Sequence, residues 1–206
     1  MATVTYALTT TTKVKLYAGV DSNYTDDDAL IDSLVSQVTD FIEAYCGDRR
    51  FLSTSYTEVR DSVDGRCVFL DQFPITALTL VEYRGGTPSV PNWITYQADG
   101  YLGYLNAGYI KFYARLPTVS QGLRITYTAG YLINFNNELT AAHTLPFDLT
   151  QVATELCAKQ YNLRKSQGIE KMQTEGQLVV FSNKTNELDN DHKLILDKYQ
   201  TLRYSI

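Results

Sequence analysis

The sequence has few of the residue types that build reaction centres. Its 206 residues include two histidines, three cysteines and one tryptophan. The cysteines, Cys46, Cys67 and Cys157, lie far apart and form no CxxC or Cys/His zinc pattern. We therefore expect no metal and no cofactor, and we expect the cysteines to be buried, reduced thiols of a protein made in the cytoplasm.

Long apolar runs and a positive net charge are also absent. No segment approaches the ~18 apolar residues that a membrane span needs, and the first residues lack the continuous apolar core of a signal peptide. The net charge is -5, which argues against a protein that grips nucleic-acid phosphates, because such proteins carry a basic face. An acidic surface does suit DNA that slides past without binding, since like charges repel.

Tyrosine, in contrast, is abundant, with 16 residues. A tyrosine ring combines an apolar body with a polar tip, which suits surfaces that are wet in the free protein and covered in a complex. Strands favour tyrosine as well, so the count is compatible with either role. The 44% hydrophobic and 20% charged residues are typical of a globular fold.

Helical periodicity predicts a small bundle of three helices, near residues 25–46, 146–167 and 187–203. In the first, eight apolar residues follow each other at steps of one or three, which places them on one face. Gly47 follows this helix as a C′ residue, and Pro146 suits the first turn of the second. The threonines before Val14 predict an additional short helix that ends at Gly19.

Between the first two helices, residues 51–131 have the character of an antiparallel β fold. Seven short segments rich in Tyr, Val, Thr and Ile alternate with turn residues, which predicts a sandwich or barrel. The fold class is therefore α+β. We predict a helical domain formed by residues 1–50 and 132–206, with a β domain inserted at 51–131.

Three consecutive aspartates, Asp26, Asp27 and Asp28, open the first predicted helix. Thr25 at the N-cap with Asp28 three residues later resembles a capping box, and acidic side chains stabilise the positive start of a helix. A metal site needs ligands that converge from other segments, and the spacing of a calcium loop is absent. We interpret the triplet as structural.

The two histidines carry the main alternative. His192 follows Asp189 and Asp191 in "ELDNDH", which reads as a cation site or, as we prefer, as an acidic helix start. His143 lies in a polar loop, and no GxSxG motif accompanies either residue. A small hydrolase that uses His143 or His192 with a carboxylate stays open, and it predicts a pocket where one histidine meets an acid and a nucleophile.

A third function class is nucleic-acid binding through stacked strand tyrosines, which would need a basic groove beside them. One loop is also a candidate for protein contact: "RGGTPSVPNW" predicts a long turn from Arg84 to Trp93 with two glycines and two prolines. Trp93 either fills the β core or docks a partner, because exposed loops often carry function.

Two segments resemble the signature helices of the head–tail connector proteins of tailed bacteriophages. "DDDALIDSLVSQVTDFIEAYCG" followed by "RRF" is similar to their first conserved helix, and "LPFDLTQVATELCAKQYNLRKSQGI" to their second. The β segment that ends in "ITYTAGY" directly before the second helix also matches longer members. The resemblance covers most of residues 9–170.

The resemblance implies a structural virion protein, an adaptor of the neck without catalytic residues. Such proteins form a ring, usually of twelve copies, beneath the portal, and DNA passes through its lumen without specific binding. Their partners are further copies, the portal protein and a downstream stopper or tail-terminator protein, with no membrane involved. Because the C-terminal segment commonly engages the portal, the resemblance assigns portal contact to Leu194, Ile195, Tyr199 and Leu202.

Overall fold

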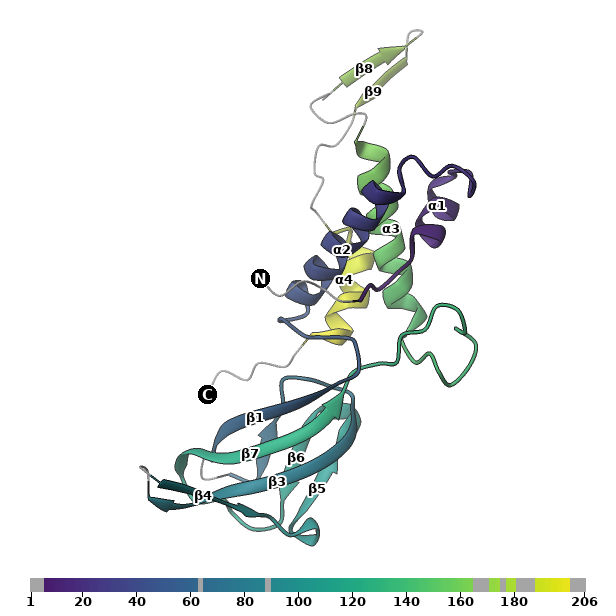
Figure 1. The fold of residues 1–206 in the computed structure, drawn as a ribbon. Helices are drawn as coiled ribbons and strands as arrows, with labels where there is room; N and C mark the ends of the chain where they lie inside the picture. Colours follow the sequence, from purple (N-terminus) through teal and green to yellow (C-terminus); the bar gives the residue numbers. More distant parts are fainter. Residues whose placement is uncertain are drawn as a thin grey trace. The chain divides into compact units, whose positions relative to one another are not determined.

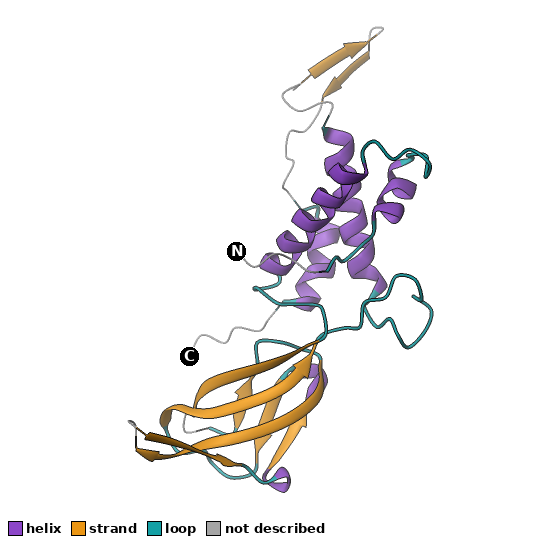
Figure 2. Ribbon diagram, in the orientation of Figure 1, coloured by secondary structure: helices purple, strands orange, loops and turns teal. Residues whose placement is uncertain are grey.

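The computed structural model describes residues 6–62, 65–87, 90–164, 171–174, 177–180 and 188–200. The chain divides into two compact units, one formed by Met1–Asp48 with Asn134–Ile206 and one formed by Arg49–Ile133 (Figure 1). The first contains the α-helices and one short hairpin and is named the helical unit, and the second is built mainly from strands and is named the β unit (Figure 2). The α+β fold class is confirmed, whereas the division into domains at residues 51 and 131 stays a prediction.

The helical unit contains α1 (Thr11–Ala18), α2 (Asp28–Tyr45), α3 (Phe147–Leu163) and α4 (Asn190–Leu196), with a 3-10 turn at Asp197–Tyr199. Helix α3 packs against the other three helices. Most of the core comes from the apolar stripes of α2 and α3, as the periodicity predicted. The buried members of these stripes are Ile31, Val35, Val38, Ile42, Leu149, Val152, Ala153, Leu156 and Cys157.

Helix α1 has the ends that its sequence predicted. The Thr10 side chain accepts a hydrogen bond from the backbone N–H of Lys13 at 3.3 Å, which caps the first turn. Gly19 follows with a φ of +70°, a left-handed conformation that costs glycine little. This short helix therefore has defined ends despite its eight residues.

The third predicted helix is shorter than 187–203, and its buried face differs from the prediction. Its α-helical part is α4, whose buried residues are His192 and Leu196. Of the residues predicted to share a face, Leu188 is buried just before the helix, whereas Ile195 and Tyr199 are half-buried, because His192 and Leu196, four residues apart, form the inner face of α4. Leu202 and the predicted end of the second helix at Gly168 lie outside the described residues.

The β unit is a sandwich of two antiparallel sheets. One sheet has the order β1-β7-β3-β4 and the other the order β2-β6-β5. The strands are β1 (Thr54–Ser62), β2 (Cys67–Phe69), β3 (Ile75–Thr87), β4 (Val90–Thr95), β5 (Tyr101–Tyr104), β6 (Tyr109–Phe112) and β7 (Val119–Ala129). The seven predicted strands are confirmed, and the sandwich alternative holds because the sheets do not close into a barrel.

The sandwich core follows the two-residue period of β-strands. On β7, Leu123, Ile125, Tyr127 and Ala129 all point inward and are fully buried. They pack with Ile110 and Phe112 of the second sheet. The Tyr127 hydroxyl donates to Glu58 and accepts from the backbone N–H of Gln72, so this buried polar atom is satisfied. Burial and the neighbouring Glu58 carboxylate raise the Tyr127 pKa.

A separate hairpin pairs β8 (Lys171–Thr174) with β9 (Gln177–Val180). It confirms the single strand predicted near residue 177 and adds a partner for it. None of the helices in the described part of the chain is long and apolar enough to cross a membrane.

Candidate interaction surfaces

The aspartate triplet joins helices, although not through the capping box that the sequence predicted. Helix α2 begins at Asp28, and its N-cap Asp27 makes no capping bond with its side chain. The Asp27 carboxylate instead accepts hydrogen bonds from the Tyr161 hydroxyl at 2.6 Å and from Arg164 at 2.7 Å. The prediction of Thr25 as the N-cap was wrong, because the Thr25 carbonyl accepts a hydrogen bond from the Asp28 N–H in a turn that precedes the helix.

These contacts assign a structural role to two of the three aspartates. The Asp27 carboxylate raises the pKa of Tyr161 and of Arg164 by accepting a hydrogen bond from each, which fixes the start of α2 to the end of α3. Asp28 pairs with the buried Lys15 of α1. Asp26 is exposed. The described residues contain no group of three or more His, Cys, Asp or Glu side chains arranged to hold a metal ion.

Both histidines are buried, in different surroundings. His192 Nε2 lies 2.7 Å from Glu155 Oε2, and its Nδ1 lies 3.9 Å from Asp189. Burial alone would raise the Glu155 pKa, but the hydrogen bonds from His192 and Gln151 outweigh it and lower the pKa. This pair connects α3 with α4.

His143 lies between two aromatic rings. Its ring centroid is 5.4 Å from that of Phe135 and 6.2 Å from that of Phe147, and its Nδ1 accepts from the backbone N–H of Asn134. Neither histidine lines the two grooves described below. The arrangement of an acid, a histidine and a nucleophile that the hydrolase alternative predicted does not occur around either residue in the described structure.

The expectation of three buried thiols was wrong for one of them. Cys46 and Cys157 are buried in the helical unit, and burial raises the Cys157 pKa to about 12. Cys67 on β2 is exposed, because its neighbour Val68 occupies the inward position of this short strand. All three are free cysteines.

The predicted long turn from Arg84 to Trp93 is a β-hairpin arm. Strands β3 and β4 continue through it, so that Arg84 pairs with Trp93 and Gly86 with Pro91. Gly86 has a φ of +77°, a left-handed conformation that glycine adopts without strain, and a side chain there would meet the Val90 carbonyl. The turn was predicted because glycine and proline interrupt most strands. The prediction was wrong because β4 is an edge strand, and an edge strand tolerates proline.

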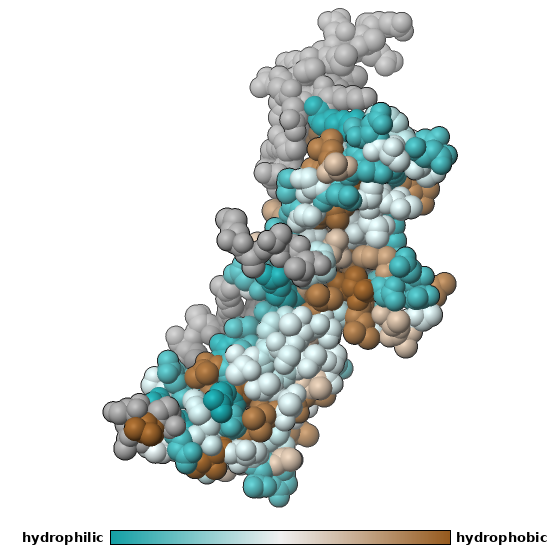
Figure 3. All heavy atoms as spheres, in the orientation of Figure 1, coloured by the Kyte–Doolittle hydropathy of each residue, from teal (hydrophilic) through white to brown (hydrophobic). Residues whose placement is uncertain are grey.

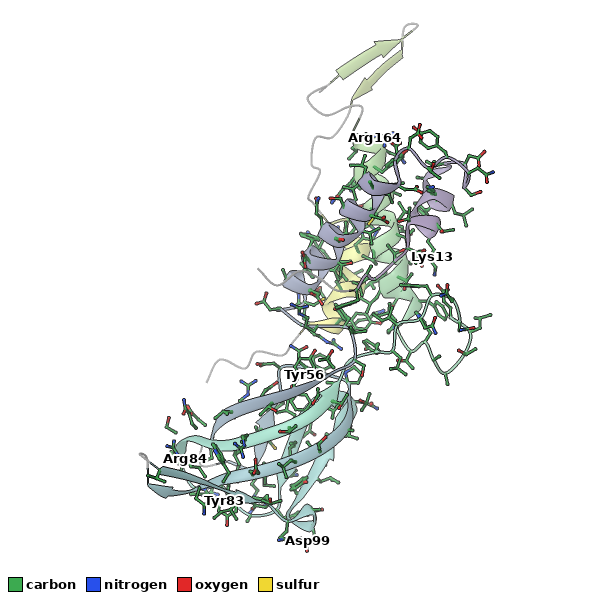
Figure 4. All side chains as sticks on the ribbon, in the orientation of Figure 1. Lys13, Tyr56, Tyr83, Arg84, Asp99 and Arg164 are labelled. Carbon is green, nitrogen blue, oxygen red and sulfur yellow. The ribbon has the colours of Figure 1, made fainter. Side chains whose placement is uncertain are left out.

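Trp93 is half-buried on this arm rather than part of the core. The Arg124 guanidinium lies 4.6 Å from the centre of its ring, and Arg124 also donates to Glu82 at 2.6 Å. Tyr83 and Arg84 line a groove of about 470 Å³ at the base of the arm, together with residues of the segment 116–123 (Figure 4). The base of the arm thus borders a groove.

The C-terminal candidates have mixed exposure. Leu194 is 66% exposed, and Ile195 is half-buried. The Tyr199 hydroxyl donates to Asp148 at 2.7 Å and so fixes the 3-10 turn to the start of α3. Among the described members of this set, Leu194 has the most exposed side chain.

Two surfaces of the helical unit expose apolar side chains. The sequence did not predict the first, and it placed the apolar residues of the second, Leu30, Leu34 and Phe41, on one face with the core residues of α2, whereas Leu30 and Phe41 are exposed. The first is a groove of about 250 Å³ between α1 and α3, here named the α1/α3 groove, which is lined by Lys13, Leu16, Tyr17, Phe147, Thr150, Gln151 and Thr154. Leu16 is 81% exposed there. The second, named the α2 ridge, consists of Leu30, Leu34, Gln37 and Phe41. Figure 3 shows apolar side chains at the surface of both units.

Comparison with known proteins identifies a family. The model of the family described as "Head completion protein" matches residues 7–202. No match was found among curated protein sequences.

The fold also occurs in solved structures of gene transfer agent (GTA) particles. One chain from the neck of a native particle, computed with C12 symmetry, aligns with a TM-score of 0.53 and 18% identity over 96% of this chain and 93% of that chain. One from the neck of an empty particle, computed with C6 symmetry, aligns with a TM-score of 0.51 and 18% identity over 85% and 80%. These likenesses concern the fold.

The family match leaves out only the first and last few residues of the chain, so it includes residues of both units and every candidate surface described above. Its description names a step of particle assembly and no reaction. The chain therefore belongs to the head completion protein family, and it is a structural protein of the virion rather than an enzyme.

Proposed function

We propose that this protein forms a ring in the neck of a tailed, phage-like particle, where it lies beneath the portal and extends the DNA channel. The match of the head completion family over residues 7–202 carries this proposal. The connector resemblance of the two long helices supports the same role.

The likeness to neck chains supports the ring and its copy number. The C12 and C6 symmetries in the titles of these structures are those of rings that contain twelve or six repeating units. We propose twelve copies, the number that fits the C12 symmetry with which the native neck was computed. The net charge of -5 suits a lumen through which DNA passes without binding.

For the partners, we propose that α4 contacts the portal through Leu194 and Ile195, with Tyr199 holding the segment in place. Leu202, assigned to the same contact, lies outside the described residues. We propose that the hairpin arm with Arg84 and Trp93 contacts the downstream stopper or tail-terminator protein. Its half-buried tryptophan is of the residue type enriched in binding hot spots.

Electron microscopy of the protein mixed with its cognate portal tests this function. We expect an additional ring on one end of the portal, coaxial with its channel. Leu194→Glu should weaken this association at least tenfold, whereas Leu102→Glu on the β unit, which is 47% exposed, serves as a control of equal chemistry. A protein that stays monomeric in the presence of portal would contradict the proposal.

A further inference from the structure

The α1/α3 groove and the α2 ridge lie on opposite sides of the helical unit. Asp28 and Asp32 of α2 bond with Lys15 and Thr11 of α1, and these contacts mark the edge of α2 that faces α1. Asp27 marks the other edge through its contacts with α3.

The α2 ridge follows the edge marked by Asp27. Leu34 and Phe41 stand seven and fourteen residues after Asp27, which is about two and four helical turns, and Leu30 stands one turn before Leu34. The ridge therefore faces away from α1. Figure 1 agrees, with α1 at the right edge of the helical unit and α2 towards its left.

The two surfaces differ in shape, and both expose apolar side chains in the described part of the unit. The groove is concave, with Leu16 81%, Tyr17 60% and Phe147 57% exposed. The ridge is the convex side of a helix, with Leu30 43% and Phe41 37% exposed. An amphipathic helix that lays its apolar residues into a groove is a common mode of recognition.

One pair of charges is also complementary. Asp40, which is negative, is exposed beside Phe41. Lys13 of α1 is positive. Lys13 lines the groove, and although it pairs with Glu138 at 2.6 Å, its ammonium has three donors.

We infer that the α2 ridge of one copy docks into the α1/α3 groove of the next copy, and that this contact closes the ring. The inference rests on the proposed function. A ring requires a head-to-tail contact between two different surfaces of the same chain. These surfaces meet that requirement because they lie on opposite sides, differ in shape and carry one complementary pair of charges, Asp40 and Lys13. Tyr17 and Phe147 would cover the ridge, with Lys13 beside Asp40.

Two single variants separate the surfaces. Leu16→Glu places a charge in the groove and Leu30→Glu places one on the ridge, and both positions are exposed enough to leave the fold intact, which circular dichroism verifies. Light scattering then measures assembly, alone and on portal. Each variant should require at least a tenfold higher concentration to assemble, whereas Leu102→Glu should assemble like the unmodified protein.

Mixing the two variants supplies the decisive result. The intact ridge of the Leu16→Glu copy can still dock into the intact groove of the Leu30→Glu copy, whereas the other two surfaces are both mutated. An equimolar mixture should therefore form heterodimers and no rings. The variants Tyr17→Cys and Phe41→Cys, each in a Cys67→Ser background and mixed in equal amounts, should form the mixed disulfide well beyond the twofold excess over each like pair that random pairing gives. A yield at or below that statistical ratio would overturn the inference.

The outcomes also distinguish the inference from the function on which it rests. If the unmodified protein forms rings and both glutamate variants form them equally well, the docking of ridge into groove is wrong while the ring function stands. If Leu16→Glu assembles normally but loses portal binding, the groove belongs to the portal and the inference is wrong. If the unmodified protein forms no ring even on portal, the function itself fails.

Discussion

The carboxylate of Asp27 should stabilise the helical unit, and its neighbour Asp26 should not. Asp27 accepts hydrogen bonds from Tyr161 and Arg164, and the side chains of Asp27 and Arg164 are 20% and 27% exposed. A hydrogen bond to a charged group is worth about 1.5–3 kcal/mol when buried, and partial exposure reduces this. We expect Asp27→Ala to cost about 2 kcal/mol and Asp27→Asn about 1 kcal/mol, because asparagine retains a neutral acceptor.

The assay is urea unfolding followed with two probes. Far-UV circular dichroism at 222 nm reports mainly on the helical unit, whereas the fluorescence of Trp93, the one tryptophan, reports on the β unit. Asp27→Ala should move the first transition to lower urea and leave the second in place. The matched control Asp26→Ala should change stability by less than about 0.5 kcal/mol.

Equal effects of the two substitutions would refute this reasoning, since they would show that the helix-start charge matters rather than the specific contacts of Asp27. So would a loss of stability on addition of EDTA, because it would indicate a bound divalent cation at the triplet. Either result would reopen the interpretation of the aspartates as structural.

Three further predictions concern single side chains. The pKa of Glu155 is lowered in the folded state, so its bond with His192 stabilises the fold at pH values above the ordinary glutamate pKa of about 4.3. This stabilisation is lost as the pH falls through the lower folded pKa. Glu155→Gln should therefore flatten the acid dependence of the unfolding midpoint, and an unchanged acid profile would contradict this. In the native protein one thiol, that of Cys67, should react rapidly with Ellman's reagent, and all three should react after unfolding; three rapid thiols in the native state would contradict the burial of the other two. Arg124→Ala should shift the Trp93 emission to longer wavelength and lower the stability of the β unit, because the cation over the ring and the ion pair with Glu82 are lost. An unchanged emission spectrum would show that Arg124 does not cover the ring in solution.

The sequence predicted the elements of the fold well where one residue pattern dominated. The stripes of α2 and α3 follow the helical period without interruption, and the strands of the sandwich alternate with clear turn residues. Thr10 and Gly19 bound α1 through local contacts that a sequence pattern contains. Such local signals do not depend on the rest of the chain.

Predictions failed where distant residues decide the structure. Asp27 bonds with residues 134 and 137 positions away, so no local pattern distinguishes it from a capping residue. The hairpin arm keeps its strands as far as Thr87 and from Val90 onwards because of its cross-strand pairing and its place at the sheet edge. The α1/α3 groove likewise depends on how α1 and α3 pack, although the exposed Leu16 and Tyr17 on so short a helix were a signal that could have indicated it.

Determination of the assembled mass tests the account most directly. We propose native mass spectrometry of the protein on its cognate portal and at high concentration alone. The account predicts a species with twelve times the 23.3 kDa mass of one chain, and it predicts that this species is absent for Leu16→Glu and for Leu30→Glu. A monomer under all conditions, or a symmetric dimer that does not grow further, would contradict it, because neither can surround a DNA channel.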